Sequence, residues 1–297
     1  MHHTIAKEQL AQYFQVSQDD VLILDRLKGG MSNSNYVCEI KNQKYTFRIP
    51  GKNAHVFVDR DREIETLKLI SPLHIDGNAL VHIDPTTGYK ISHYIEGTSL
   101  LAKNPSDYYE AAAKVLHQLH DANLQTTLDY QPYQRLSNYE ALVHQEGIEH
   151  DPSYFEIRDK FLALRDYLNS FPKVFCHNDS QPSNFIDIGD ELVLVDWEFG
   201  GLNDPLYDIA CYGNFDFQFA KELLPIYLDR TPTLDEWKRL FLWRTFQCLQ
   251  WHNVALYKEA IGLSAELHLD FKQIARNYIT KARSEERRVG KECRSRW

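Results

Sequence analysis

Three oxygen-bearing side chains follow one another at short intervals between residues 179 and 196. Asn184 stands five positions after Asp179, and Asp196 ends an apolar run twelve residues later. Phosphoryl transfer needs a carboxylate beside the attacking hydroxyl group and oxygen ligands for Mg²⁺. The spacing therefore predicts a phosphoryl-transfer site with Asp179 as the catalytic base and with Asn184 and Asp196 as the magnesium ligands.

Turns and helix caps are the alternative use of Asp and Asn, and they account for any one of these residues alone. The flanking segments favour the combined interpretation. Residues 173–175, 184–186 and 192–195 have the composition of short strands, and Gly189-Asp190 forms a turn between the last two. A loop and the end of a hairpin are then expected to meet at one point.

Composition limits the partners of the chain. Its 297 residues include 42 acidic and 33 basic side chains, for a formal net charge of −9. This balance argues against general binding to nucleic acid or anionic membranes, and it suits a small cationic substrate. The sequence has no apolar run near the roughly 18–20 residues that span a bilayer, so we expect no membrane insertion.

The cysteines and the termini indicate the compartment and the extent of the fold. Five scattered cysteines without CxxC spacing indicate reduced thiols, and the first residues have no signal-peptide core. We therefore expect a cytoplasmic protein. Residues 284–297 carry five basic side chains without apolar periodicity, so we expect them to be a non-native tail.

Periodicity changes near residue 96. Before this point, alternating segments and turn residues predict a five-stranded antiparallel sheet with helices at 5–14 and 60–70, and after it helical periods dominate. The expected strands are 21–27, 36–40, 44–49, 79–83 and 89–95, and the later helices are 105–122, 137–147, 153–169, 216–228, 233–258 and 265–283. We predict an α+β protein with an N-terminal nucleotide-binding lobe (1–96), a mostly helical catalytic and acceptor-binding lobe (97–283), and a cleft between them.

The turn after the first strand is a candidate phosphate-binding segment. Gly29 and Gly30 allow close approach of the backbone to phosphates, and Ser32 and Asn33 add polar groups. A plain hairpin turn is the alternative. The segment is not a Walker loop, because no Gly-Lys-Ser/Thr follows.

Arg48 is a cation flanked by core residues in the third strand, so it needs an anionic partner. Glu63, in the helix at 60–70, could supply one. Such a pair fixes the α- and β-phosphates of a nucleotide in kinases, whereas a purely structural ion pair is the alternative.

Seven motifs, which follow one another in the order typical of the family, resemble the choline kinase branch of the aminoglycoside-phosphotransferase and choline kinase family, especially its bacterial members. They cover roughly residues 20–260. The motifs are Gly29-Gly30-Met31-Ser32-Asn33, Tyr45-Thr46-Phe47-Arg48, Arg60 with Glu63, Leu116-His117-Gln118-Leu119-His120, Cys176-His177-Asn178-Asp179 with Asn184, Asp196-Trp197-Glu198-Phe199, and Asn203-Asp204-Pro205-Leu206-Tyr207-Asp208-Ile209-Ala210.

The resemblance implies a protein-kinase-like two-lobed fold that uses ATP and Mg²⁺. It implies the same roles for Asp179, Asn184 and Asp196 as above. It places Tyr94 and Ile95 at the adenine pocket. Asp208 and His177 are implied as supports of the catalytic loop. The implied acceptor-binding residues are Glu198, Tyr207, Tyr212, Asp216, Trp243 and Trp251.

The aromatic residues of the helix at 233–258 favour a quaternary ammonium acceptor. Aromatic faces beside a negative charge hold such a group, whereas an aminoglycoside needs many carboxylates. The helix carries Trp243 and Trp251 and has acids only near its ends, although either Trp could instead pack in the core. Two positions depart from the family pattern: Val254 replaces an aromatic residue, and Phe215 replaces an acid.

His117 and His120 are three residues apart on a helix. No further Cys or His in the sequence pattern completes a metal-binding set with them, so we interpret both as packing residues.

Together these features predict a kinase that transfers the γ-phosphoryl group of ATP to the hydroxyl of choline, giving phosphocholine. Ethanolamine, thiamine or an aminoglycoside are alternative acceptors for the same fold. An inactive nucleotide-binding scaffold is the alternative from a different class, and the set Asp179, Asn184 and Asp196 argues against it.

Overall fold

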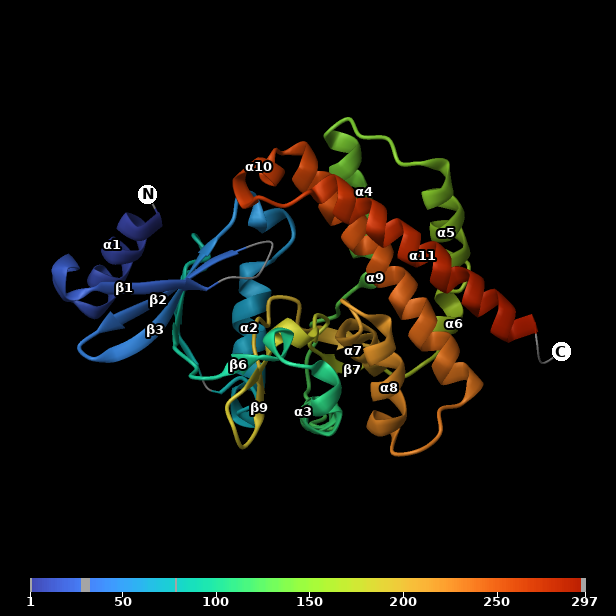
Figure 1. The fold of residues 1–297 in the computed structure, drawn as a ribbon, viewed down its shortest axis with the longest axis horizontal. Coiled ribbons are helices and arrows are strands. Elements are labelled where there is room, and N and C mark those ends of the chain that lie inside the picture. The colour runs from blue at the N-terminus through green and yellow to red at the C-terminus, as the bar shows by residue number, and fades with distance from the viewer. Residues whose placement is uncertain (1, 28–32, 78, 295–297) are drawn as a thin grey trace. The chain divides into compact units, whose positions relative to one another are not determined.

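A computed structural model describes residues 2–27, 33–77 and 79–294 of the chain. The chain divides into two compact units (Figure 1). The sheet unit consists of Met1–Pro105 and Pro182–Gly200, and the helical unit consists of Ser106–Gln181 and Gly201–Trp297. The predicted fold class, an N-terminal five-stranded antiparallel sheet with a helical C-terminal part, is confirmed.

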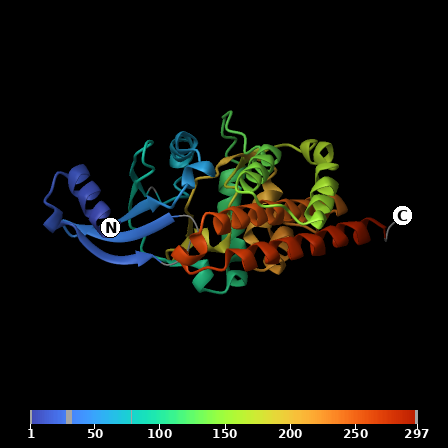
Figure 2. The same cartoon turned by 90° about the horizontal axis from the view of Figure 1, so that it is seen from above.

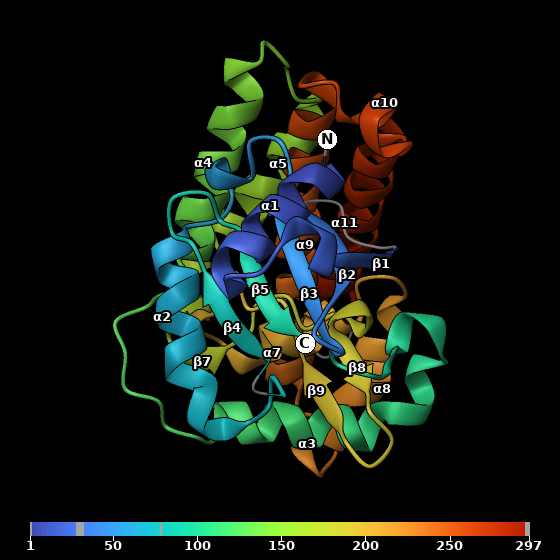
Figure 3. The same cartoon turned by 90° about the vertical axis from the view of Figure 1, so that its left-hand side faces the viewer.

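The sheet unit is built on five antiparallel strands in the order β1-β2-β3-β5-β4 (Figure 3). The strands are β1 (Leu22–Leu27), β2 (Asn33–Ile40), β3 (Gln43–Pro50), β4 (Leu80–Ile83) and β5 (Lys90–His93). Lys41 and Asn42 join β2 to β3 and both have positive φ, at 52° and 62°. This is the two-residue turn whose twist matches that of paired strands.

Two helices accompany this sheet. The helix α1 (His2–Phe14) lies across it and buries Ala6 and Leu10 in a core shared with Phe47 (Figure 3). The helix α2 (Arg60–Ile70) begins where the Asp59 side chain accepts hydrogen bonds from the first-turn N–H groups. Its buried face is spaced by three and four residues and includes Glu63, a charged group whose burial requires partners.

A second, three-stranded sheet in the same unit has the order β6-β8-β9. Its strands are β6 (Thr98–Ser99), β8 (Phe185–Asp187) and β9 (Leu192–Leu194). The Leu194 N–H donates to the Ile75 carbonyl at 2.7 Å, which attaches β9 to the segment after α2. Thus the sheet unit also includes the stretch of chain that carries Asn184 and Asp196.

The helical unit is organised around α9 (Leu234–Ala260), a helix of 27 residues that is buried on most of its circumference. Its start is fixed by a capping box between Thr233 and Glu236. The long helix α11 (Phe271–Arg294) runs alongside α9 (Figures 1 and 2). The His252 ring of α9 donates to the Ala275 carbonyl of α11 at 2.9 Å.

The remaining elements of the helical unit pack against α9 or against the elements next to it. They are α3 (Tyr109–His120), α4 (Pro132–Gln145), α5 (Pro152–Leu162), α6 (Arg165–Asn169), α7 (Pro205–Tyr212), α8 (Phe217–Leu228), α10 (Leu263–Leu267), and the paired strands β7 (Val174–Cys176) and β10 (Gly201–Asn203). Short 3₁₀ turns occur at Gln18–Asp20, Ala54–Val56, Ser71–Leu73, Leu100–Ala102, Pro105–Tyr108 and Pro182–Asn184.

Several element boundaries differ from the sequence expectation. The helix expected at 153–169 is two helices, α5 and α6, and the one expected at 265–283 is α10 and α11. The structure adds α7, which has no solvent-exposed face because all of Leu206–Tyr212 is buried. No helix in the described ranges combines the length and the apolar character needed to cross a membrane.

Candidate active site

The loop after β7 presents Asp179. Asn178 has a left-handed backbone, at φ 64°, and its side-chain amide donates to the carbonyls of Cys176 and Gly201 at 3.1 Å. The Asp179 N–H donates to Nδ1 of His177, and the Asp179 side chain accepts from Gln181 Nε2 at 3.2 Å. These contacts fix the turn, so the Asp179 carboxylate is held in a defined direction with 7% exposure.

Asp208 holds the same loop from α7. Its carboxylate accepts the backbone N–H of His177 at 2.8 Å and that of Asn178 at 2.7 Å. The Ser180 hydroxyl donates to the same carboxylate at 3.0 Å, and His120 Nε2 lies 3.0 Å from it. Burial tends to raise the pKa of Asp208, but the His120 hydrogen bond and nearby donors outweigh it and lower the pKa. The buried carboxylate is therefore ionised and occupied by donors.

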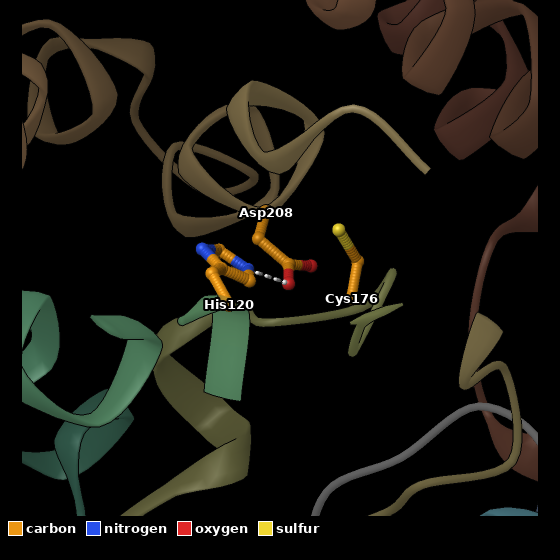
Figure 4. Close-up of side chains that lie close together, drawn as sticks. All are labelled: His120, Cys176 and Asp208. Atoms are coloured by element: carbon orange, nitrogen blue, oxygen red, sulfur yellow. Dashed lines mark hydrogen bonds and ion pairs between the residues drawn. The ribbon is translucent and has the colours of Figure 1, made fainter. Parts of the chain in front are cut away.

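His120 lies beside Cys176 and Asp208 (Figure 4). Their potential ligand atoms lie within 4.8 Å of one another, and His117 is not part of this group. Each group already has a partner: His120 Nδ1 lies 2.8 Å from the Tyr227 hydroxyl, and the Cys176 thiol donates to the Val174 and Asn203 carbonyls. Burial raises the pKa of the Cys176 thiol. The arrangement is a hydrogen-bonded core cluster around a neutral thiol.

Asn184 and Asp196 are brought together in the sheet unit. The N–H of Val195, which directly precedes Asp196, donates to the Asn184 carbonyl at 2.9 Å. Asp196 follows β9 with a left-handed backbone, at φ 68°, a conformation that is uncommon for non-glycine residues but that Asp adopts more readily than most. Its side chain is 39% exposed, so its oxygens are accessible. An amide oxygen and an accessible carboxylate are donors that fit Mg²⁺.

A buried charge cluster lies in the same unit. Arg48 donates from Nη1 and Nη2 to the two oxygens of Glu63, each at 2.7 Å. Arg60 Nη1 lies 2.7 Å from Glu63, and Lys90 Nζ lies 3.1 Å from it. Burial would raise the pKa of Glu63, but the charges of Lys90, Arg48 and Arg60 lower it well below its usual range. Glu63 is thus a fixed anion among three cations.

Glu198 and Asp196 are two further carboxylates near the cations of this cluster. Arg48 Nη1 lies 3.8 Å from Asp196 and 3.6 Å from Glu198, and Arg60 Nη1 lies 3.4 Å from Glu198. Burial and the Asp196 charge raise the pKa of Glu198 to about 7. Asn33 donates from Nδ2 to Glu198 at 3.3 Å.

The structure describes only some of the other predicted nucleotide-binding residues. Gly29, Gly30 and Ser32 lie outside the described residues. The Tyr94 N–H donates to the Lys44 carbonyl at 3.1 Å, which continues the sheet pattern past β5. Ile95 is half-buried, near Gly77 and Val193.

Three of the predicted acceptor-binding aromatics lie in the core of the helical unit. Tyr207 and Tyr212 are 0% exposed and Trp243 is 2% exposed. The ring of Tyr207 lies 5.5 Å from that of Trp243, and the Trp243 indole N–H donates to Asp204 at 2.8 Å. This burial favours the packing alternative for the three residues.

Trp251 and Asp216 have different surroundings. Trp251 is half-buried on α9, so part of its ring is open to solvent. Asp216 is exposed and caps α8 by accepting the Gln218 N–H at 2.9 Å.

Two cations, one half-buried and one fully buried, were missed from the sequence. Lys90 stands opposite Arg48 in the β3–β5 register, and only this register reveals that both cations share Glu63. Arg244 is 1% exposed on α9. The available signal for Arg244 was a basic residue within an apolar stretch of a helix.

The sequence match to a protein family assigns this chain to a class. The model of the choline/ethanolamine kinase family matches residues 24–241. The chain belongs to the choline/ethanolamine kinase family.

The chain is also similar in sequence and structure to individual proteins of this kind. Protein LicA of Haemophilus influenzae is 25% identical over 255 residues, which cover 79% of this chain and 73% of the relative. The crystal structure of choline kinase LicA from Streptococcus pneumoniae matches with a TM-score of 0.78 at 25% identity, covering 96% of this chain and 98% of that one. A LicA structure in complex with AMP matches with a TM-score of 0.77 at 25% identity, covering 97% and 98%.

Proposed function

We propose that the protein transfers the γ-phosphoryl group of ATP to the hydroxyl group of choline, giving phosphocholine. The observation that carries this proposal is the set of hydrogen bonds that the loop 177–180 donates to the Asp208 carboxylate. A loop fixed at several points can present Asp179 to a hydroxyl group without reorganisation. Family membership supports the reaction class, and the similarity to choline kinase LicA supports the acceptor.

In this proposal Asp179 orients the acceptor hydroxyl and accepts its proton late in transfer. Arg48, held by Glu63, places a fixed positive charge for the nucleotide phosphates. Asn184 and Asp196 would hold Mg²⁺, which offsets charge on the phosphate oxygens when bound. The sheet unit would serve as the nucleotide lobe and the helical unit as the catalytic and acceptor lobe. The AMP complex of LicA supports a nucleotide as the donor.

We place the reaction in the cytoplasm. Four of the five cysteines, Cys38, Cys176, Cys211 and Cys248, are free and buried, which agrees with a reducing compartment. We expect no nucleic-acid partner, because the net charge is −9.

Ethanolamine is the second candidate acceptor. Tyr207, Tyr212 and Trp243 are buried in the core, so fewer aromatic faces remain for a quaternary ammonium than the sequence suggested. A primary ammonium group needs hydrogen-bond acceptors instead of an aromatic cage. The family description includes both alcohols.

The test is an ADP-release assay with Mg-ATP and, separately, choline, ethanolamine, thiamine and kanamycin. We expect kcat/KM to be highest for choline. A higher value for ethanolamine would transfer the assignment to that alcohol. A lack of ADP release with every acceptor would support the scaffold alternative and contradict the proposal.

A further inference from the structure

A chain of hydrogen bonds connects Asp179 to the C-terminal helix within the helical unit. The Tyr278 hydroxyl of α11 donates to Asn214 Oδ1 at 3.2 Å. Asn214 Nδ2 donates to Gln181 Oε1 at 2.6 Å, and Gln181 Nε2 donates to the Asp179 carboxylate at 3.2 Å. Tyr278 and Asn214 are buried, so water does not compete strongly for their bonds.

The direction of these bonds is determined at each step. Because the ionised Asp179 carboxylate can only accept, the Gln181 NH₂ must face it, and Gln181 Oε1 then accepts from the Asn214 NH₂. Asn214 Oδ1 therefore faces the Tyr278 hydroxyl, which donates to it. A donor aimed at a carboxylate favours the ionised form and a single orientation.

Arg244 fixes the backbone of Asn214, the residue in the middle of this series of hydrogen bonds. Its Nη2 donates to the Asn214 carbonyl at 3.2 Å, and Nη1 contacts Gln247. The guanidinium lies 5.4 Å from the centre of the Phe217 ring. Its Nε has no hydrogen-bond partner, and among the side chains that the structure describes, which end at Glu285 in α11, no carboxylate forms an ion pair with it. A buried cation without a direct counter-charge is costly, so its position calls for a reason.

The charges of Arg244 and Asp179 both affect the pKa values of Tyr278 and Cys211. Burial is the main cause that raises the pKa of Tyr278 to about 12; Asp179 raises this pKa further and Arg244 lowers it. Burial is also the main cause that raises the pKa of the Cys211 thiol; Asp179 raises this pKa further and Arg244 lowers it. The two charges therefore lie in one buried electrostatic environment.

We propose that Asn214 and Arg244 are positioning residues for Asp179, acting through Gln181. Asn214 anchors the Gln181 amide in this orientation, and Arg244 holds the Asn214 backbone while supplying a buried positive charge. This proposal rests on the role of Asp179 as the base. It predicts that the packing of α9 and α11 controls the rate of phosphoryl transfer without controlling ATP binding.

The kinetic test uses Asn214→Leu and Arg244→Met. We expect each to lower kcat by roughly 10- to 100-fold, because small displacements of a catalytic group have effects of this size, while KM for ATP stays within about twofold. Arg244→Lys should restore part of the lost kcat. Asn253→Leu is the matched control, since Asn253 is a fully buried amide on α9 that bonds Tyr154 and the Leu249 carbonyl. It should lower the unfolding midpoint and leave kcat near the wild-type value.

A loss of kcat in the control equal to that of Asn214→Leu would overturn the proposal, because general destabilisation would then explain both. So would an unchanged kcat in folded Asn214→Leu and Arg244→Met.

A second measurement separates this inference from the proposed reaction. Urea-unfolding midpoints are compared for Asn214→Leu, Gln181→Leu and the double variant. Residues in one network are not additive, so the double variant should shift the midpoint by clearly less than the two single shifts combined. The pair Asn253→Leu and Gln181→Leu should be additive. If the wild-type protein phosphorylates no acceptor, the proposed function fails while this comparison still decides the relay, and additive Asn214 and Gln181 shifts would refute it.

Discussion

The guanidinium of Arg48 and the carboxylate of Glu63 form a bidentate ion pair, with both hydrogen bonds at 2.7 Å and both side chains almost fully buried. Arg60 and Lys90 add two more cations around the same carboxylate. Glu63→Gln would leave one buried and two half-buried cations facing a neutral amide. We expect it to lower the free energy of unfolding by roughly 3–5 kcal/mol, measured by urea denaturation.

The exposed pair of Lys44 and Glu96 provides the control for this prediction. Its N–O distance is 2.9 Å, close to that of the buried pair, but Glu96 is 76% exposed. Glu96→Gln should therefore leave the unfolding midpoint essentially unchanged. Equal effects of the two substitutions would show that burial does not determine the contribution of Glu63.

Asp208→Asn should reduce both stability and turnover. The amide would place an NH₂ group among donors that now share the carboxylate, including the N–H groups of His177 and Asn178. The expected loss is roughly 3–5 kcal/mol in the free energy of unfolding, with a fall in kcat because the loop that carries Asp179 loosens. Asp121→Asn, at an exposed carboxylate that pairs with His117, should change neither. A fully active Asp208→Asn protein would be inconsistent with this role.

The sequence predicts elements well where a local signal is strong. The helix over residues 60–70 is observed at those bounds, because Asp59 caps it and its buried residues recur every three or four positions. The helix α7 was not predicted, since uniform burial removes the periodicity, although Asp204 as the cap and Pro205 in the first turn were available signals.

The same distinction applies to the candidate site. The motif around Asp179 indicates the chemistry, because residue type and spacing are local properties. The proximity of Cys176 to His120, and the burial of Trp243, depend on how distant segments pack. No spacing along the chain encodes such contacts, so aromatic residues at helical intervals could not be divided into core and surface.

The two tryptophans of α9 should respond differently to substitution. Trp251 is half-buried, so Trp251→Ala should raise KM for choline by roughly 3- to 30-fold, the range of one cation–π contact. Trp243 donates to Asp204 in the core, so Trp243→Phe should cost about 1–3 kcal/mol of stability and leave KM unchanged. Steady-state kinetics and urea denaturation measure the two effects. The reverse outcome would exchange their roles.

The packing of α9 against α11 should weaken in acid. Burial lowers the pKa of His252 to about 4, although its hydrogen bond to the Ala275 carbonyl raises it. The unfolded chain, with a His pKa near 6.5, binds more protons than the native protein between about pH 4 and 6.5. The stabilisation is therefore complete above about pH 6.5 and is lost as the pH falls towards 4, by an amount on the order of 3 kcal/mol.

His252→Asn tests this pH dependence, since an amide can still donate to the Ala275 carbonyl. Unfolding free energies of the variant and the wild-type protein should converge as the pH falls from 7 to 4. A constant difference over this interval would mean that His252 does not titrate as described.

The most direct measurement of the central claim is the formation of phosphocholine from Mg-ATP and choline by the wild-type protein and by Asp179→Ala. The account predicts that the wild-type protein forms phosphocholine and that kcat of the folded variant falls by at least about a hundredfold, because the base is lost. A folded Asp179→Ala protein that turns over at the wild-type rate would contradict it.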